Sequence, residues 1–117
     1  MDSIELKKRT KQFALRIIKL VNALPNNSVG KCISHQLIRS GTSIGANYRA
    51  ACRGRSKAEF NSKLHIVLEE ADETIFWLEL IIEAEIIPQN KIESILKEAN
   101  ELTAIFAKLY QTAKSNK

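Results

Sequence analysis

One short segment matches a motif that contains the nucleophilic serine in some hydrolases: Gly41-Thr42-Ser43-Ile44-Gly45. In that pattern, G-x-S-x-G, the serine stands on a sharp turn between a strand and a helix, where its hydroxyl attacks an acyl carbon. This sequence shows no sustained alternation of apolar and polar residues and no Asn-Gly or Asp-Gly turn, so the required strand is missing. We therefore predict that Ser43 lies within a helix and is not a nucleophile.

The other residues with metal-binding or redox chemistry are His35, His65, Cys32 and Cys52. Neither histidine has a glutamate three residues before it or a histidine four residues after it, so the di-iron and zinc-protease patterns are absent. The cysteines form no C-x-x-C pair, and on a single helix they would be about 30 Å apart, too far for a disulfide. We predict no catalytic residue, no metal site and no cofactor, and hence no enzyme.

Basic side chains gather between residues 25 and 57, a segment without any Asp or Glu. They are Lys31, Arg39, Arg49, Arg53, Arg55 and Lys57. The first four fall on the outer side of a helix over 29–53, opposite its apolar residues, and the last two extend the positive charge past its end. Such a stripe suits the phosphate backbone of a nucleic acid, and we predict that these residues bind one. Four basic residues near the amino terminus can widen the surface: Lys7, Lys8, Arg9 and Lys11.

Acidic neighbours offer another explanation for the same stripe. Residues 58–87 contain eight Asp or Glu and only one Lys or Arg. A basic face is often simply solvated, or it pairs with carboxylates on an adjacent helix. Charge alone leaves both interpretations open.

Apolar residues surround nearly the whole helix near residues 75–82, more than one bundle core can cover. Self-association is the simplest way to cover the remainder, and a patch beneath a long loop is the alternative. We predict an oligomer interface formed by Phe76, Trp77, Leu80 and Ile81.

Small residues are concentrated on the second helix, where each internal glycine costs about 1 kcal/mol of helix propensity. We interpret Gly41, Gly45 and their small neighbours as a tight contact between helices, within the bundle or between subunits. Asn47 borders the apolar face and could form a hydrogen bond with a neighbouring helix.

Helical spacing of apolar residues positions all of these groups. It predicts four helices, at about 3–24, 29–53, 57–85 and 88–113, separated by Pro25-Asn26-Asn27, Gly54 and Pro88. Ser28 is the expected N-cap of the second helix, and Ser56 with Glu59 has the form of a capping box for the third. Short connections reverse the chain, so we predict an all-α fold, an antiparallel up-down-up-down four-helix bundle.

A length of 117 residues suits one domain spanning 1–117, with a core from all four helices. No run approaches the roughly 18 apolar residues of a membrane span, and the first residues do not form a signal peptide. We expect a cytoplasmic protein without a membrane partner.

Four segments resemble one known family: RSGTSIGANYR at 39–49, SKAEF at 56–60, EADET at 70–74 and WLEL at 77–80. The chain is similar to the four-helix-bundle proteins associated with intervening sequences of bacterial 23S ribosomal RNA genes, also called the S23 ribosomal protein-like family. The resemblance implies a left-handed bundle, a homopentamer and a non-enzymatic role. By analogy with members that accompany diversity-generating retroelements, it also implies nucleic acid and a reverse transcriptase as partners. Similar sequences usually have a glutamate after the Asn-Tyr-Arg triplet, where this chain has Ala50.

Two functions remain open from the sequence. The first is a homo-oligomeric bundle that binds RNA or DNA through its basic face without catalysis. The second is a protein-interaction scaffold with no direct nucleic-acid contact.

Overall fold

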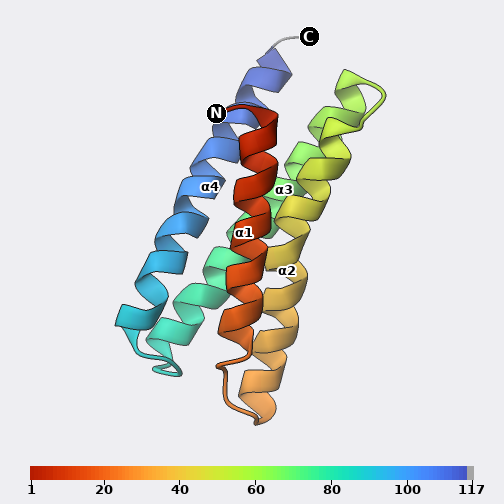
Figure 1. The fold of residues 1–117 in the computed structure, drawn as a ribbon. Helices are drawn as coiled ribbons and strands as arrows, with labels where there is room; N and C mark the ends of the chain where they lie inside the picture. The colour runs from red at the N-terminus through yellow and green to blue at the C-terminus, as the bar shows by residue number, and fades with distance from the viewer. Residues whose placement is uncertain (116–117) are drawn as a thin grey trace.

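The computed structural model describes residues 1–115 and contains four helices, with no strand among the described residues. The helices are α1 (Ser3–Val21), α2 (Ser28–Cys52), α3 (Lys57–Glu83) and α4 (Gln89–Ser115). The connection between α1 and α2 and that between α3 and α4 lie at one end of the molecule, and the connection between α2 and α3 lies at the other, the end where α1 begins (Figure 1). The predicted all-α fold is confirmed; residues 116–117 of the predicted domain lie outside the described residues.

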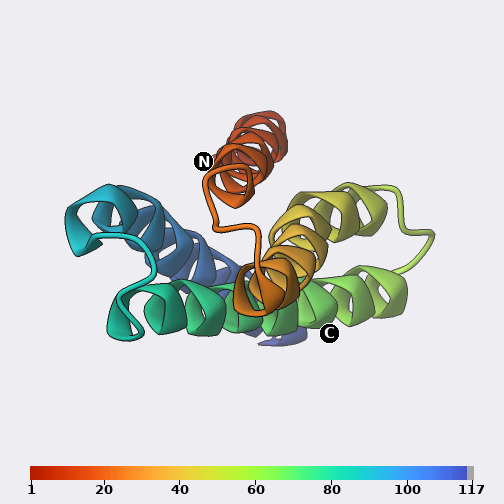
Figure 2. The same ribbon diagram turned by 90° about the horizontal axis from the view of Figure 1, so that it is seen from below.

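The four helices enclose one elongated core. Viewed from below, α1 lies over the space between α2 and α4, and α3 lies on the opposite side (Figure 2). The bundle measures 47 × 21 × 20 Å. Helix α2 packs most extensively against α3, whereas the contact between α1 and α4 is the lightest of the four neighbouring pairs. Side chains of α2 and α4 still meet in the core, where the rings of Tyr48 and Phe106 lie 5.3 Å apart, edge to face.

Side-chain caps set the starts of three helices. Oxygens of Asp2, Asn27 and Ser56 accept hydrogen bonds from backbone N–H groups in the first turns of α1, α2 and α3. The predicted cap Ser28 is instead the first residue of α2, because Asn27 Oδ1 reaches the N–H of Gly30 at 2.8 Å. The first helix ends at Val21, three residues before the predicted end, and the chain then tightens into a turn before Pro25.

The buried face of α3 includes a polar residue among apolar ones. Thr74 and Ile81 lie fully buried at its centre, with Ile75 and Ile82 half-buried at its sides. The Thr74 hydroxyl lies 3.0 Å from Ser40 Oγ of α2 and 2.8 Å from the Glu70 carbonyl oxygen. Because its polar atom is satisfied in this way, a threonine can occupy the core without a large desolvation cost.

Glycines allow α1 to approach α2 closely. A Cβ atom at Gly41 would lie 2.8 Å from Ile17 Cγ1, and one at Gly45 would lie 3.2 Å from Thr10 Oγ1. The tight contact predicted from the small residues therefore lies within the bundle. The expected bond from Asn47 to a neighbouring helix is not formed, because its Nδ2 donates to the Ser43 carbonyl of α2 itself at 2.9 Å.

Candidate nucleic-acid interface

The basic residues of α2 are distributed along its whole length. Lys31 and Arg53 are separated by 22 positions in the sequence, which corresponds to about 33 Å along a helix. Lys31 lies beside His35 in a hollow at the α1–α2 connection, at the end of the molecule opposite to Arg53. The six predicted nucleic-acid ligands therefore do not form a single patch.

Arg39, in the middle of α2, is neutralised by α3. Its guanidinium donates to Glu70 Oε2 at 3.0 Å and forms a second ion pair with Glu73. Glu73 also accepts a hydrogen bond from Trp77 Nε1 at 3.1 Å, which holds the carboxylate in place. For Arg39 the alternative of pairing with an acidic neighbour is correct, so this residue is not a ready phosphate ligand.

Arg9 of α1 is neutralised in the same manner by α4. Its guanidinium donates two hydrogen bonds to Glu98, both at 2.7 Å, and a third to Glu101 at 3.0 Å. These bonds hold the pKa of Glu98 below its usual value and raise the pKa of Arg9. Arg9 therefore contributes to the bundle and does not widen the basic surface.

A hollow between α1 and α2 brings together cations from both helices. We call it the α1–α2 hollow; it measures about 150 Å³. It is lined by Lys7, Thr10, Lys11, Ala14, Thr42, Gly45, Ala46 and Arg49. Its inner wall contains small side chains because α1 approaches α2 at Gly45, and its three cations lie one or more turns apart on two helices.

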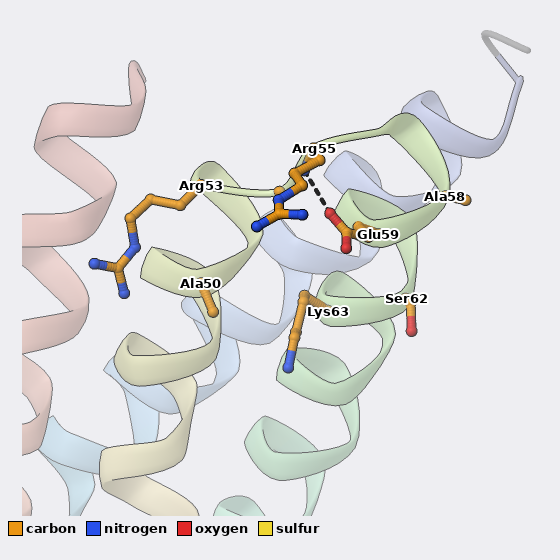
Figure 3. Close-up of a pocket in the computed structure, with 8 residues that line it drawn as sticks. Ala50, Arg53, Arg55, Ala58, Glu59, Ser62 and Lys63 are labelled. Carbon is orange, nitrogen blue, oxygen red and sulfur yellow. Dashed lines mark hydrogen bonds between the residues drawn. The ribbon is translucent and has the colours of Figure 1, made fainter.

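A larger hollow lies between the end of α2 and the start of α3. We call it the α2–α3 hollow; it measures about 500 Å³. It is lined by Ala50, Arg53, Gly54, Arg55, Ala58, Glu59, Ser62 and Lys63. In Figure 3, Arg55 reaches from the connection toward the end of α2, Lys63 extends along α3 with its amine directed away from Arg55, and Arg53 extends toward α1.

The connection between α2 and α3 fixes the shape of this hollow. Gly54 brings the end of α2 against the first turn of α3, where a Cβ atom would lie 3.1 Å from the Ala51 carbonyl oxygen and 3.3 Å from Glu59 Cβ. Ser56 Oγ caps α3 by accepting from the N–H of Glu59 at 3.1 Å. The Glu59 carboxylate in turn accepts from the backbone N–H of Arg55 rather than from that of Ser56, so the capping box takes a shifted form.

The two hollows are neighbours, because Arg49 and Arg53 lie one helical turn apart on α2. Six cations surround them, and we call this set the basic end: Lys7, Lys11, Arg49, Arg53, Arg55 and Lys63. Within residues 1–115 the side chains of these six residues form no ion pair. Lys8 and Lys57 are exposed nearby but do not line either hollow.

Lys63 is the member of the basic end that sequence reasoning missed. It is the sole basic residue between 58 and 87, a segment that contains eight Asp or Glu. The signal that could have found it is its position one turn after Glu59, on the side of α3 that meets the end of α2.

In residues 1–115 no group of three or more His, Cys, Asp or Glu could hold a metal ion. The G-x-S-x-G segment is continuous α-helix, as predicted, and the Thr42 hydroxyl donates to the Ile38 carbonyl of the same helix at 2.6 Å. No helix among the described residues is long and apolar enough to span a membrane.

Comparison with known proteins decides the family. The model of the 23S rRNA-intervening sequence protein family matches residues 2–108. The chain belongs to this family. It is also similar to a crystal structure of a protein of unknown function from the S23 ribosomal protein family of Bacteroides thetaiotaomicron, with a TM-score of 0.87 and 40% sequence identity over 95% of this chain and 99% of that chain. No curated protein matches the sequence. The family resemblance seen in the motifs is thus confirmed.

In this intervening-sequence protein, the apolar surface of α3 is smaller than predicted. Phe76 is 54% exposed and lies edge to face against Trp77, with ring centres 5.1 Å apart. Trp77 and Leu80 are half-buried. Ile81 is 0% exposed because it points into the core of its own chain, so its assignment to an oligomer interface is wrong.

Proposed function

We propose that this intervening-sequence protein is a non-enzymatic, homo-oligomeric bundle that binds RNA or another nucleic acid through the basic end. In this proposal the helices form a left-handed, up-down-up-down bundle that acts in the cytoplasm. The observation that supports it most is the contrast in pairing: Arg39 and Arg9 are neutralised by carboxylates, whereas the six cations of the basic end form no ion pair in the described chain. Unpaired cations from three helices fit a polyanion better than they fit a role in stability.

Salt dependence tests the nucleic-acid part of the proposal. If the six cations of the basic end each neutralise one phosphate, the logarithm of affinity should fall with the logarithm of salt concentration with a slope of about −4 to −5. The measurement is fluorescence anisotropy of a labelled RNA at several salt concentrations. An affinity that does not change with salt would contradict the proposal.

Self-association is supported by the exposed ring of Phe76 beside half-buried Trp77 and Leu80. An exposed aromatic patch of this kind is covered most simply by a second copy, and the family resemblance favours a pentamer. Size-exclusion chromatography with light scattering should give a pentamer for the wild type and smaller particles for Phe76→Ser. A monomeric wild type would contradict this part of the proposal.

A protein-interaction scaffold remains the second candidate because α3 exposes carboxylates near the same patch. Glu79 and Glu83 are exposed at the end of α3 that is away from the basic end, and Glu85 is exposed just after this helix. Affinity purification before and after nuclease treatment separates the two functions. Protein partners, a reverse transcriptase among them, that survive nuclease favour the scaffold, whereas partners lost with the nucleic acid favour the proposal.

A further inference from the structure

The α2–α3 hollow has a shape and a charge that the rest of the basic end does not share. Its volume of about 500 Å³ falls within the range of small-molecule sites, so it is large enough for a nucleotide. The α1–α2 hollow, of about 150 Å³, is far smaller. The two hollows are therefore suited to different parts of a polyanion.

Cations reach the α2–α3 hollow from two sides. Arg55 lines it from the connection between the helices, and Lys63 lines it from α3 (Figure 3). Glu59 is the only carboxylate among the lining residues, and its oxygen already accepts the backbone N–H of Arg55. With Arg53 at the rim, the lining carries three positive charges and one negative charge.

The excess positive charge of the hollow matches a terminal phosphate better than a phosphate inside a strand. A terminal phosphate monoester carries a charge of about −1.5 to −2 at pH 7, whereas a phosphate inside a strand carries a single negative charge. Arginine binds phosphate through paired N–H groups, and lysine binds it as a point charge. A hollow lined by arginine and lysine side chains, with only one carboxylate, therefore favours the doubly charged terminal group.

The surroundings indicate how a strand would approach. The connection between α2 and α3 passes over one side of the hollow, and Arg53 extends away from it toward α1 (Figure 3). Arg49, one turn earlier, belongs to the α1–α2 hollow with Lys7 and Lys11. A strand that crosses α1 and α2 along these cations would reach the α2–α3 hollow at its end.

We infer that the α2–α3 hollow binds the terminal phosphate of a nucleic-acid strand, with Arg55 and Lys63 as its ligands, while the α1–α2 hollow contacts internal phosphates of the same strand. This inference rests on the proposed function and deepens it. It assigns to the protein a preference for phosphorylated strand ends over hydroxyl ends.

Ala50 provides a test that removes no ligand. Its side chain lies in the wall of the hollow beside Arg55 and Lys63 (Figure 3). Ala50→Glu would add a carboxylate to the wall of the hollow that both cations line, and Ala50→Gln adds nearly the same bulk and helix propensity without the charge. Circular dichroism would show that both variants are folded.

The experiment compares three versions of one single-stranded RNA oligonucleotide: with a 5′-phosphate, with a 3′-phosphate, and with hydroxyls at both ends. The wild type should bind at least one phosphorylated version about tenfold more tightly than the hydroxyl version, as expected for one additional charge-assisted contact. Ala50→Gln, which adds bulk to the same wall without the charge, should keep more of this preference than Ala50→Glu. Ala50→Glu should bind all three versions with similar affinity.

Each other outcome overturns a defined part of the account. Equal wild-type affinities for the three oligonucleotides would overturn the inference and leave the proposed function standing. A phosphate preference that persists in Ala50→Glu would likewise place the terminal group outside this hollow. If the wild type binds none of the three oligonucleotides, both the inference and the proposed function are overturned.

Discussion

The middle and the end of α2 both carry arginines on the outer surface, but these arginines differ in their contacts with the neighbouring helices. Arg39 is held by Glu70 and Glu73, whereas Arg49 and Arg53 border open hollows. The difference comes from α3. Most of its acidic residues lie from Glu69 onward, and Glu70 and Glu73 meet the middle of α2. The part of α3 that meets the end of α2 contains Glu59 and Lys63. The placement of charge on the partner helix therefore decides which basic residues stay available for a ligand.

The largest expected effect is the loss of RNA affinity when the two arginines at the end of α2 are removed. The double variant Arg49→Ala and Arg53→Ala should weaken RNA affinity on the order of 100-fold and reduce the magnitude of the salt slope by about 1.4 to 1.8, because two phosphate contacts are lost. Arg39→Ala is the matched control and should change affinity by less than about twofold. Fluorescence anisotropy at several salt concentrations measures both. Equal losses in the two variants would contradict the comparison.

A substitution in the middle of the α1–α2 contact should affect stability and spare the basic end. In Gly41→Ala the new Cβ would meet the fully buried Ile17, and we expect a net loss of about 1–2 kcal/mol of unfolding free energy after the gain in helix propensity. Chemical denaturation measures the loss, and Ala107→Ser on the exposed side of α4 is the control. If Gly41→Ala proves as stable as the wild type, the contact is looser than described.

The pair between Arg9 and Glu98 should make stability depend on pH. Its hydrogen bonds lower the pKa of Glu98 in the folded state, so the stabilisation is complete above the unfolded pKa of about 4.3 and is lost as the pH falls through the folded value. We expect Glu98→Gln to cost about 1 kcal/mol at pH 7 and progressively less below about pH 4. Denaturation of both proteins across pH 2–7 tests this, and a constant difference over that range would contradict it.

The smallest expected effect is the release of Arg39. The double variant Glu70→Gln and Glu73→Gln should cost about 0.5 kcal/mol in stability, because Arg39 is 47% exposed and solvent weakens its ion pairs. The same change should strengthen RNA binding slightly and increase the magnitude of the salt slope by up to about 0.9. Unchanged binding would show that the middle of α2 lies outside the reach of the nucleic acid even when its charge is free.

Sequence reasoning predicted the helices well because their signals are local. Apolar spacing, the capping oxygen of Ser56 and the break at Pro25 each act within a few residues of a helix end. The errors have a different origin. Thr74 can lie in the core because its hydroxyl bonds with Ser40 of another helix, a contact that the spacing of apolar residues does not reveal.

The candidate site was less predictable because it depends on pairs of helices. The sequence showed that Arg39 and Arg49 share a basic side of α2, but only the packing shows that Arg39 meets two carboxylates and Arg49 none. Lys63 was hidden because it is a single basic residue in a segment that is acidic as a whole. The exposure of Ile81 was overestimated because an all-apolar segment does not indicate which residue faces inward.

Protection of lysines by RNA tests the central claim most directly. Acetylation of the wild-type protein, followed by mass spectrometry with and without RNA, reports each lysine separately in an unaltered chain. Lys7, Lys11 and Lys63 should become less reactive when RNA is bound, while Lys31 at the opposite end should react as before. Protection of Lys31 with unchanged reactivity at Lys63 would contradict the account.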